Sequence, residues 1–128
     1  MKVLCIGSMN LDHVYIMDHI VAPGETEAVK EIKNYLGGKG MNQSVALAKA
    51  GANIYHAGLL GPDGLVFLEA CKEHGVKGEY IRQIDELTGH AIIQIDKNAQ
   101  NCILLYGGAN QKLDASYVDE VLAGFSAG

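Results

Sequence analysis

The stretch Gly37-Gly38-Lys39-Gly40-Met41-Asn42-Gln43-Ser44 decides the fold of this chain, because it joins a glycine-rich turn directly to a helical pattern. Three glycines remove side-chain bulk, so a ligand can approach the backbone closely. The amides that begin the helix can donate to ligand oxygens. Lys39 adds a positive charge, and Asn42 adds a group that donates and accepts hydrogen bonds. An ordinary entry into a helix needs one or two glycines, so the pattern favours a ligand-binding turn.

The same stretch matches neither of the two common phosphate-binding motifs. A Walker A loop requires Gly-Lys followed by Ser or Thr, whereas Lys39 is followed by Gly40. A dinucleotide fingerprint requires G-x-G-x-x-G after the first strand, where this chain has the single Gly7. A generic nucleotide-binding Rossmann domain is therefore disfavoured.

A second polar segment, Gly7–Asp12, follows the first apolar run. In open α/β sheets, ligands bind beyond the carboxyl ends of the strands. Asn10 and Asp12 are two residues apart, so in extended backbone their side chains point the same way. A carboxylate beside an amide suits a ligand with adjacent hydroxyls. The alternative is a polar turn capped by Asp12, and the segment taken alone favours that turn.

Composition limits the classes of protein to which the chain can belong. Its 128 residues are 48% hydrophobic and 20% charged, which is typical of one soluble globular domain. A net charge of −5 argues against nucleic-acid or anionic-membrane partners. Cys5, Cys71 and Cys102 are an odd number without CxxC spacing, and no signal peptide is recognisable, which favours a reducing cytoplasm. The scattered histidines show no metal-ligand spacing, so no metal site is predicted.

Hydrophobic periodicity predicts strands that alternate with helices. The expected strands are Val3–Ile6, His13–Met17, Ala28–Tyr35, Ile54–Leu59, Tyr80–Ile84, His90–Asp96 and Cys102–Tyr106, with the last two forming a hairpin. The expected helices are Lys39–Ala50, a segment capped by Asp63 and ended by Gly75, and Asp114–Ala123. Thr88-Gly89 and Gly107–Asn110 are expected to be turns, and Phe125–Gly128 to lead toward a further strand. This order predicts an α/β fold: a mostly parallel sheet flanked by helices, with a small β insertion.

Together these segments resemble the ribokinase-like carbohydrate kinase family, also called the phosphofructokinase B family. Four pieces fall in the family order: GSMNLD at 7–12, PGET at 23–26, GGKGMNQS at 37–44 and GPDG at 61–64. The GGKG-x-NQ form is most similar to the ribokinase branch. Residues 1–128 then correspond to the N-terminal part of a ribokinase-like domain. Met41 replaces a usually small residue, and we expect a change in packing there without loss of ligand contact.

The resemblance implies a sugar site. By similarity to the family, Asn10 and Asp12 hold sugar hydroxyls, and Gly38, Lys39 and Asn42 complete that side of the pocket. The ligand would be a ribose-like small sugar.

The resemblance also implies a small β lid. Its strands lie at roughly 13–36 and 88–107, cover the sugar and make a homodimer contact.

The family's catalytic part does not occur in this sequence. Its GAGD motif supplies an anion hole and the Asp that takes the hydroxyl proton, so the 128-residue chain alone is expected to contain no catalytic residue and to be inactive. The C-terminal ATP-binding half is absent too; ATP and Mg²⁺ are implied for a full-length member, and neither is expected to bind this chain tightly.

Two functions stay open. One is the sugar-binding portion of a kinase that phosphorylates the primary hydroxyl of a pentose such as ribose. The other is a truncated, non-catalytic sugar-binding or dimerisation module.

Overall fold

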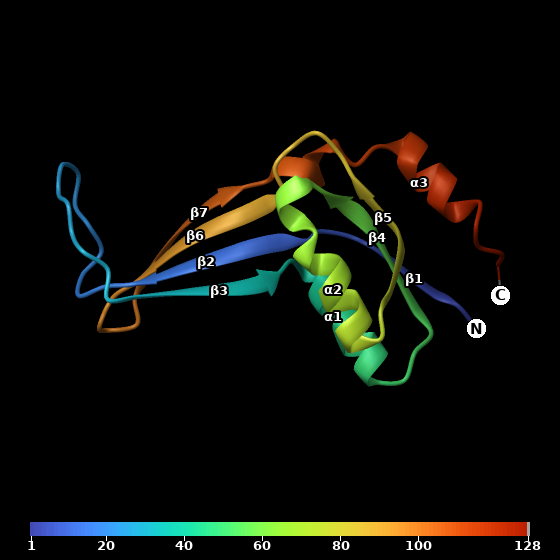
Figure 1. The fold of residues 1–128 in the computed structure, drawn as a ribbon, viewed down its shortest axis with the longest axis horizontal. Helices are drawn as coiled ribbons and strands as arrows, with labels where there is room; N and C mark the ends of the chain where they lie inside the picture. Colours follow the sequence, from blue (N-terminus) through green and yellow to red (C-terminus); the bar gives the residue numbers. More distant parts are fainter. Residues whose placement is uncertain (128) are drawn as a thin grey trace.

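The computed structural model describes residues 1–127, whose strands form two separate sheets. The first, which we call the body sheet, is parallel and has the order β1 (Val3–Ile6), β4 (Ile54–Leu60), β5 (Lys77–Gln83). The second, the lid sheet, has the order β3 (Glu31–Gly37), β2 (Asn10–Ile16), β6 (Gly89–Ile95), β7 (Asn101–Tyr106). In the lid sheet only the central pair, β2 and β6, is parallel. The lid sheet extends away from the body, with the β2–β3 loop beyond its far end (Figure 1).

Helices cover both faces of the body sheet. The helices α1 (Lys39–Lys49) and α2 (Val66–His74) pack on one face, and α3 (Ala115–Leu122) packs on the other (Figure 1). Strand β4 is buried along its whole length, as expected for a central parallel strand. The predicted fold class, a mostly parallel sheet flanked by helices with a β lid, is confirmed. No helix within residues 1–127 is both long and apolar enough to cross a bilayer.

The alternation of side chains along β4 separates two hydrophobic clusters. Ile54 points toward α1 and α2, where Phe67 is fully buried. Leu59 points to the opposite face and packs with Tyr117 of α3. Burying one such large side chain contributes about 1.5–3 kcal/mol. The body is thus a three-layer unit with β4 at its centre.

The sequence prediction that Asp63 caps a helix is wrong, because its carboxylate has a distant partner. Asp63 does not cap α2, which begins without a side-chain cap. Its carboxylate Oδ1 instead accepts from the backbone N–H (2.8 Å) and the hydroxyl (2.7 Å) of Thr88. Thr88 is fully buried, and its Oγ1 also accepts from the N–H of Gly61 at 2.9 Å. Thr88 therefore links the GPDG turn to the lid. Asp63 bonds to this distant residue and does not cap α2.

Strand boundaries differ from prediction where polar residues take part in a sheet. Strand β2 begins at Asn10, three residues before the predicted start, so Asn10 and Asp12 lie in a strand and not in a turn. Strand β5 likewise begins at Lys77 and not at Tyr80. Of residues 107–110, which were predicted to be a turn, all but Gly107 belong to a 3-10 helix, Gly108–Lys112. Neighbouring strands supply the hydrogen bonds that the local sequence does not encode.

The end of the chain gives a partial test of the predicted further strand. Phe125 is not in a strand, and its ring packs against Tyr55 and Tyr80 with both centroid separations at 5.3 Å. Gly128, the last residue of that prediction, lies outside the described residues.

The glycines of the opening stretch let the start of α1 touch the turn between β1 and β2. A Cβ added to Gly40 would lie 2.6 Å from backbone atoms of Gly7, which is closer than real contacts allow. Gly38 has φ +98°, and a Cβ there would overlap the Ser8 carbonyl. The N–H of Met41 donates to that carbonyl at 3.1 Å. The expectation that the first helical amides are free for a ligand is therefore wrong for Met41.

The substitution Gly40→Ala tests this contact, because the contact decides whether the substitution stabilises or destabilises the protein. In an exposed helix, Gly→Ala stabilises by about 1 kcal/mol. Here we expect destabilisation by about 1–3 kcal/mol, because the new methyl group must push two backbone segments apart. Chemical denaturation of both proteins measures the difference. A Gly40→Ala protein as stable as the parent would show that the segments are not in contact.

A buried polar pair fastens α1 to β4. His56 is fully buried, and its Nδ1 lies 2.8 Å from the hydroxyl oxygen of Ser44. Burial lowers the pKa of His56 to about 4, against a smaller opposing effect of the Gly7 backbone. The imidazole is therefore neutral at pH 7. Full burial and the contact with Ser44 make His56 a structural residue of the core.

His56 should make stability depend on pH. The unfolded state binds a proton with a pKa near 6.5 and the folded state with a pKa of about 4. The stabilisation is therefore complete above pH 6.5 and declines as the pH falls toward 4, by up to about 1.4 kcal/mol per unit. Unfolding free energies measured across this range should fall less steeply for His56→Gln, while exposed His74→Gln keeps the parent slope. Equal slopes for parent and His56→Gln would contradict the assignment.

Candidate functional site

A hollow of about 280 Å³ lies where the lid sheet joins the body, and we call it the junction hollow. Its lining comes from the β1–β2 turn, the start of β2, the start of α1 and the segment around the end of β7: Ser8, Asn10, Lys39, Leu105, Gly107 and Asn110. The structure thus brings together Asn10 and Lys39, which are 29 positions apart and which the sequence singled out separately.

Asn110 is the residue that sequence reasoning missed. Its Nδ2 donates to Asn10 Oδ1 at 2.8 Å and to the Met9 carbonyl at 3.1 Å. Its Oδ1 accepts from the Met9 N–H at 3.1 Å. A side chain at Gly89 would overlap both amides, so glycine there leaves room for their bond. Asn10 and Asn110 are 100 residues apart, and no local pattern signals their pairing.

Asp12 lies on the same face of β2 as Asn10, two residues further along. Its carboxylate lies over Gly37, where any side chain would overlap it. Burial raises the pKa of Asp12, and the neighbouring His13 opposes this shift. No hydrogen bond contributes to the shift. A partly desolvated carboxylate of this kind is suited to accept hydrogen bonds from a ligand.

The two other predicted site residues lie on the opening stretch. Gly38 lies against the backbone of Ser8 and Met9 and precedes Lys39, but it is not among the residues that line the junction hollow. Asn42 borders a different hollow of about 180 Å³, which Met41 also lines. Its membership of the same site therefore stays a prediction. Met41 itself is almost fully buried in the core, so its side chain takes part in packing. The expected change in packing without loss of ligand contact stays a prediction.

A larger hollow, of about 400 Å³, lies between β5 and α3, far from the glycine turn. Its main polar groups already have partners. The Tyr117 hydroxyl donates to the Tyr80 carbonyl at 2.6 Å and accepts from the Gly58 N–H at 2.8 Å. Arg82 pairs with Glu120. These contacts attach α3 to the sheet, so the junction hollow is the better candidate site.

Comparison with known proteins shows the family to which the chain belongs. Residues 1–126 match the family described as pfkB family carbohydrate kinase. The chain belongs to this family. It is 36% identical over 116 residues to the ribokinase of Haemophilus influenzae, covering 88% of this chain and 38% of that protein. This pfkB-family chain therefore spans well under half of the length of that relative.

Solved structures show the same relationship. A ribokinase from Cryptococcus neoformans var. grubii in complex with ADP has a TM-score of 0.79 and 38% identity, over 84% of this chain and 35% of that one. Arabidopsis thaliana ribokinase complexed with ribose and ATP has a TM-score of 0.76 and 35% identity, over 84% and 36%. The resemblance inferred from the sequence motifs is confirmed.

Proposed function

We propose that this chain forms the sugar-binding side of a ribokinase-type kinase, whose full-length form transfers the γ-phosphate of ATP to the primary hydroxyl of a pentose such as ribose. The observation that carries the proposal is the junction hollow, where Asn10 and Lys39 meet and Asp12 follows on the same strand face. The relationship to ribokinases, one of them solved with ribose and ATP, supports the choice of sugar.

The side chains of the site would divide the contacts with sugar hydroxyls between them. Asn10 Oδ1 is engaged by Asn110, which leaves the Asn10 amide N–H groups as donors. Asp12 can accept from two adjacent hydroxyls. We assign the further contacts to Lys39, Gly38 and Asn42. Hydrogen bonds to charged groups contribute about 1.5–3 kcal/mol each, so Asp12 and Lys39 should contribute most to the affinity.

The lining of the hollow fits a neutral polyol better than a triphosphate. It contains a single lysine, and within residues 1–127 no group of carboxylates that could hold Mg²⁺ occurs there. In the full-length protein we assign ATP and Mg²⁺ to other residues, where the ion would bridge the phosphates.

We also propose a cytoplasmic location, in line with free thiols at Cys5, Cys71 and Cys102.

Ribose titration of the ¹⁵N-labelled chain tests the site. We expect weak, saturable binding that shifts the amide signals of Asn10, Asp12 and Lys39, because Asn10 and Lys39 line the junction hollow and Asp12 follows Asn10 on the same face of β2. Asp12→Asn should weaken binding about tenfold or more, since the amide loses charge and accepting capacity. Asp119→Asn, on the exposed face of α3, should bind as the parent does.

Two outcomes of that titration would reject the assignment. One is ribose binding that Asp12→Asn leaves unchanged. The other is a set of shifts centred on Tyr80 and Arg82, which would move the site to the hollow between β5 and α3.

We propose further that the lid sheet pairs with the lid of a second copy. Strand β7 is exposed along its whole length. On one face, Leu104 is 66% exposed and its cross-strand neighbour Ile92 is 37% exposed. Ile32 on β3 is 52% exposed on the same face, judged from the strand register. Apolar groups gathered on one sheet face favour association, and twofold pairing is the commonest form.

Sedimentation velocity over a concentration series tests this pairing. We expect a dimer at high micromolar concentration, and a monomer for the double variant Ile32→Asp/Leu104→Asp, because the charges would be buried in the interface. Leu65→Asp, 48% exposed at the start of α2, is the matched control and should remain dimeric. Val14 is unsuitable for such a test because it is 7% exposed inside the lid. A parent protein that sediments as a monomer throughout would refute the pairing.

A further inference from the structure

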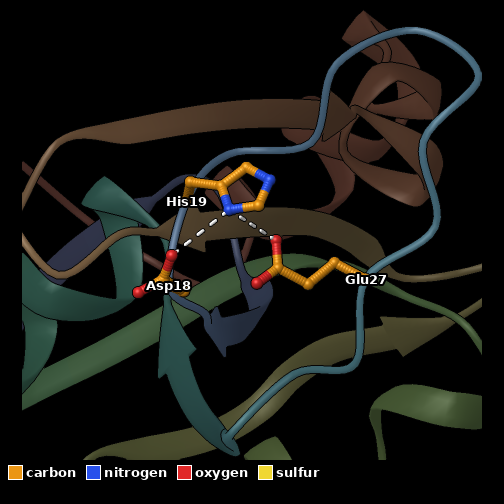
Figure 2. A group of neighbouring side chains, drawn as sticks. All are labelled: Asp18, His19 and Glu27. Carbon is orange, nitrogen blue, oxygen red and sulfur yellow. Dashed lines mark hydrogen bonds and ion pairs between the residues drawn. The ribbon is translucent and has the colours of Figure 1, made fainter.

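Three ionisable side chains converge beyond the far end of the lid sheet. They belong to residues 17–30, the loop between β2 and β3, which we call the tip loop (Figure 1). His19 Nδ1 lies 3.4 Å from Asp18 Oδ2 and 3.1 Å from Glu27 Oε2. Figure 2 shows both carboxylates directed at this one nitrogen. The three ligand atoms lie within 4.8 Å of one another.

This arrangement gives one nitrogen two carboxylate partners. Nδ1 carries either one proton or one lone pair, so it can donate to only one of them. Glu27 Oε2 is buried and makes no hydrogen bond within residues 1–127. A buried carboxylate oxygen without a hydrogen bond is costly. A cation between the three atoms would satisfy all of them at once.

The opposite side of the ring is held by a third carboxylate. His19 Nε2 lies 2.8 Å from Glu25 Oε1, and the Ala22 N–H donates to the same oxygen at 3.1 Å. When Nε2–H donates to Glu25, the lone pair of Nδ1 faces Asp18 and Glu27. A histidine that ligates a metal through one nitrogen and donates to a carboxylate through the other is the usual outer-shell arrangement of metal sites.

We propose that Asp18, His19 and Glu27 bind a divalent transition-metal ion such as Zn²⁺, with Glu25 orienting the imidazole. Ligand atoms about 2.1 Å from a tetrahedral ion are about 3.4 Å apart, which matches the 3.4 Å and 3.1 Å separations found here. One nitrogen and two carboxylates suit Zn²⁺ better than Ca²⁺ or Mg²⁺, which prefer six or more oxygens. His19 is half exposed, so water can complete the coordination.

The neighbouring lysine limits the affinity without blocking the site. Lys97 Nζ lies 3.5 Å from Asp18 Oδ1, the oxygen that does not face His19. Its charge offsets part of the negative charge of the cluster. The ligands come from both ends of the tip loop, so the ion would join the end of β2 to the segment that precedes β3. Sequence spacing gave no signal, since only one histidine takes part and Glu27 is brought close by the fold.

Calorimetric titration of the metal-free 128-residue chain with ZnCl₂ at about pH 8, above the ordinary pKa of free imidazole, tests the proposal. We expect one ion per chain. His19→Ala and Glu27→Gln should each weaken binding at least tenfold, and Glu25→Gln should weaken it about 10–100-fold by releasing the ring. X-ray absorption of the zinc-loaded chain should show one nitrogen and at least two oxygens at about 2.0–2.2 Å.

Matched controls separate this site from unspecific binding. His74→Ala and Glu73→Gln remove the same groups from exposed positions on α2 and should bind Zn²⁺ as the parent does. All substituted side chains are at least partly exposed, and amide spectra outside the tip loop should stay unchanged. The proposal is overturned if the parent shows no saturable binding. It is also overturned if His19→Ala binds as tightly as the parent, since carboxylates alone would then account for the ion.

Discussion

The close backbone contact between the β1–β2 turn and the start of α1 is the constraint on which the rest of the structure depends. At this point the chain passes from the body sheet to the lid sheet through Ser8, and returns through Gly38. The two passages touch, and the Ser8 carbonyl accepts from the Met41 N–H. Only glycine at positions 7 and 40 permits this approach. Asn10 and Lys39 line one hollow because the two backbone segments that carry them are held in contact at Gly7 and Gly40.

The other two passages between the sheets are fastened by hydrogen bonds. Before β6, Thr88 is held by Asp63, and those bonds keep the pKa of Asp63 below its usual value even though burial acts in the opposite direction. After β7, Asn110 is held by Met9 and Asn10. Hydrogen bonds are directional, so these contacts fix the angle of the lid more closely than apolar packing would. Three of the four passages, those at Ser8, Lys39 and Asn110, line the junction hollow, so its shape depends on that angle.

Local patterns predicted the helices and the central strands, because their side chains repeat with the period of the element. Helix α1 and strand β4 were found within one residue of their predicted ends. The predictions failed where a partner distant in sequence decided the outcome. Asp63 looked like a helix cap, but a bond to a residue 25 positions away took its place. Asn110 could not be connected to Asn10, since nothing near either residue records their contact.

The candidate sugar groups and the tip-loop cluster lie at opposite ends of the same strand. Asn10 is the first residue of β2 and Ile16 the last, and six steps of about 3.3 Å separate them by about 20 Å. Asn10 is therefore positioned by the body through Asn110, whereas His19 is positioned by the turn that holds Glu25. A change confined to the tip loop leaves the bonds at the junction intact. The strand that joins the two sites is paired on both sides, with β3 and β6, so its register is fixed between them.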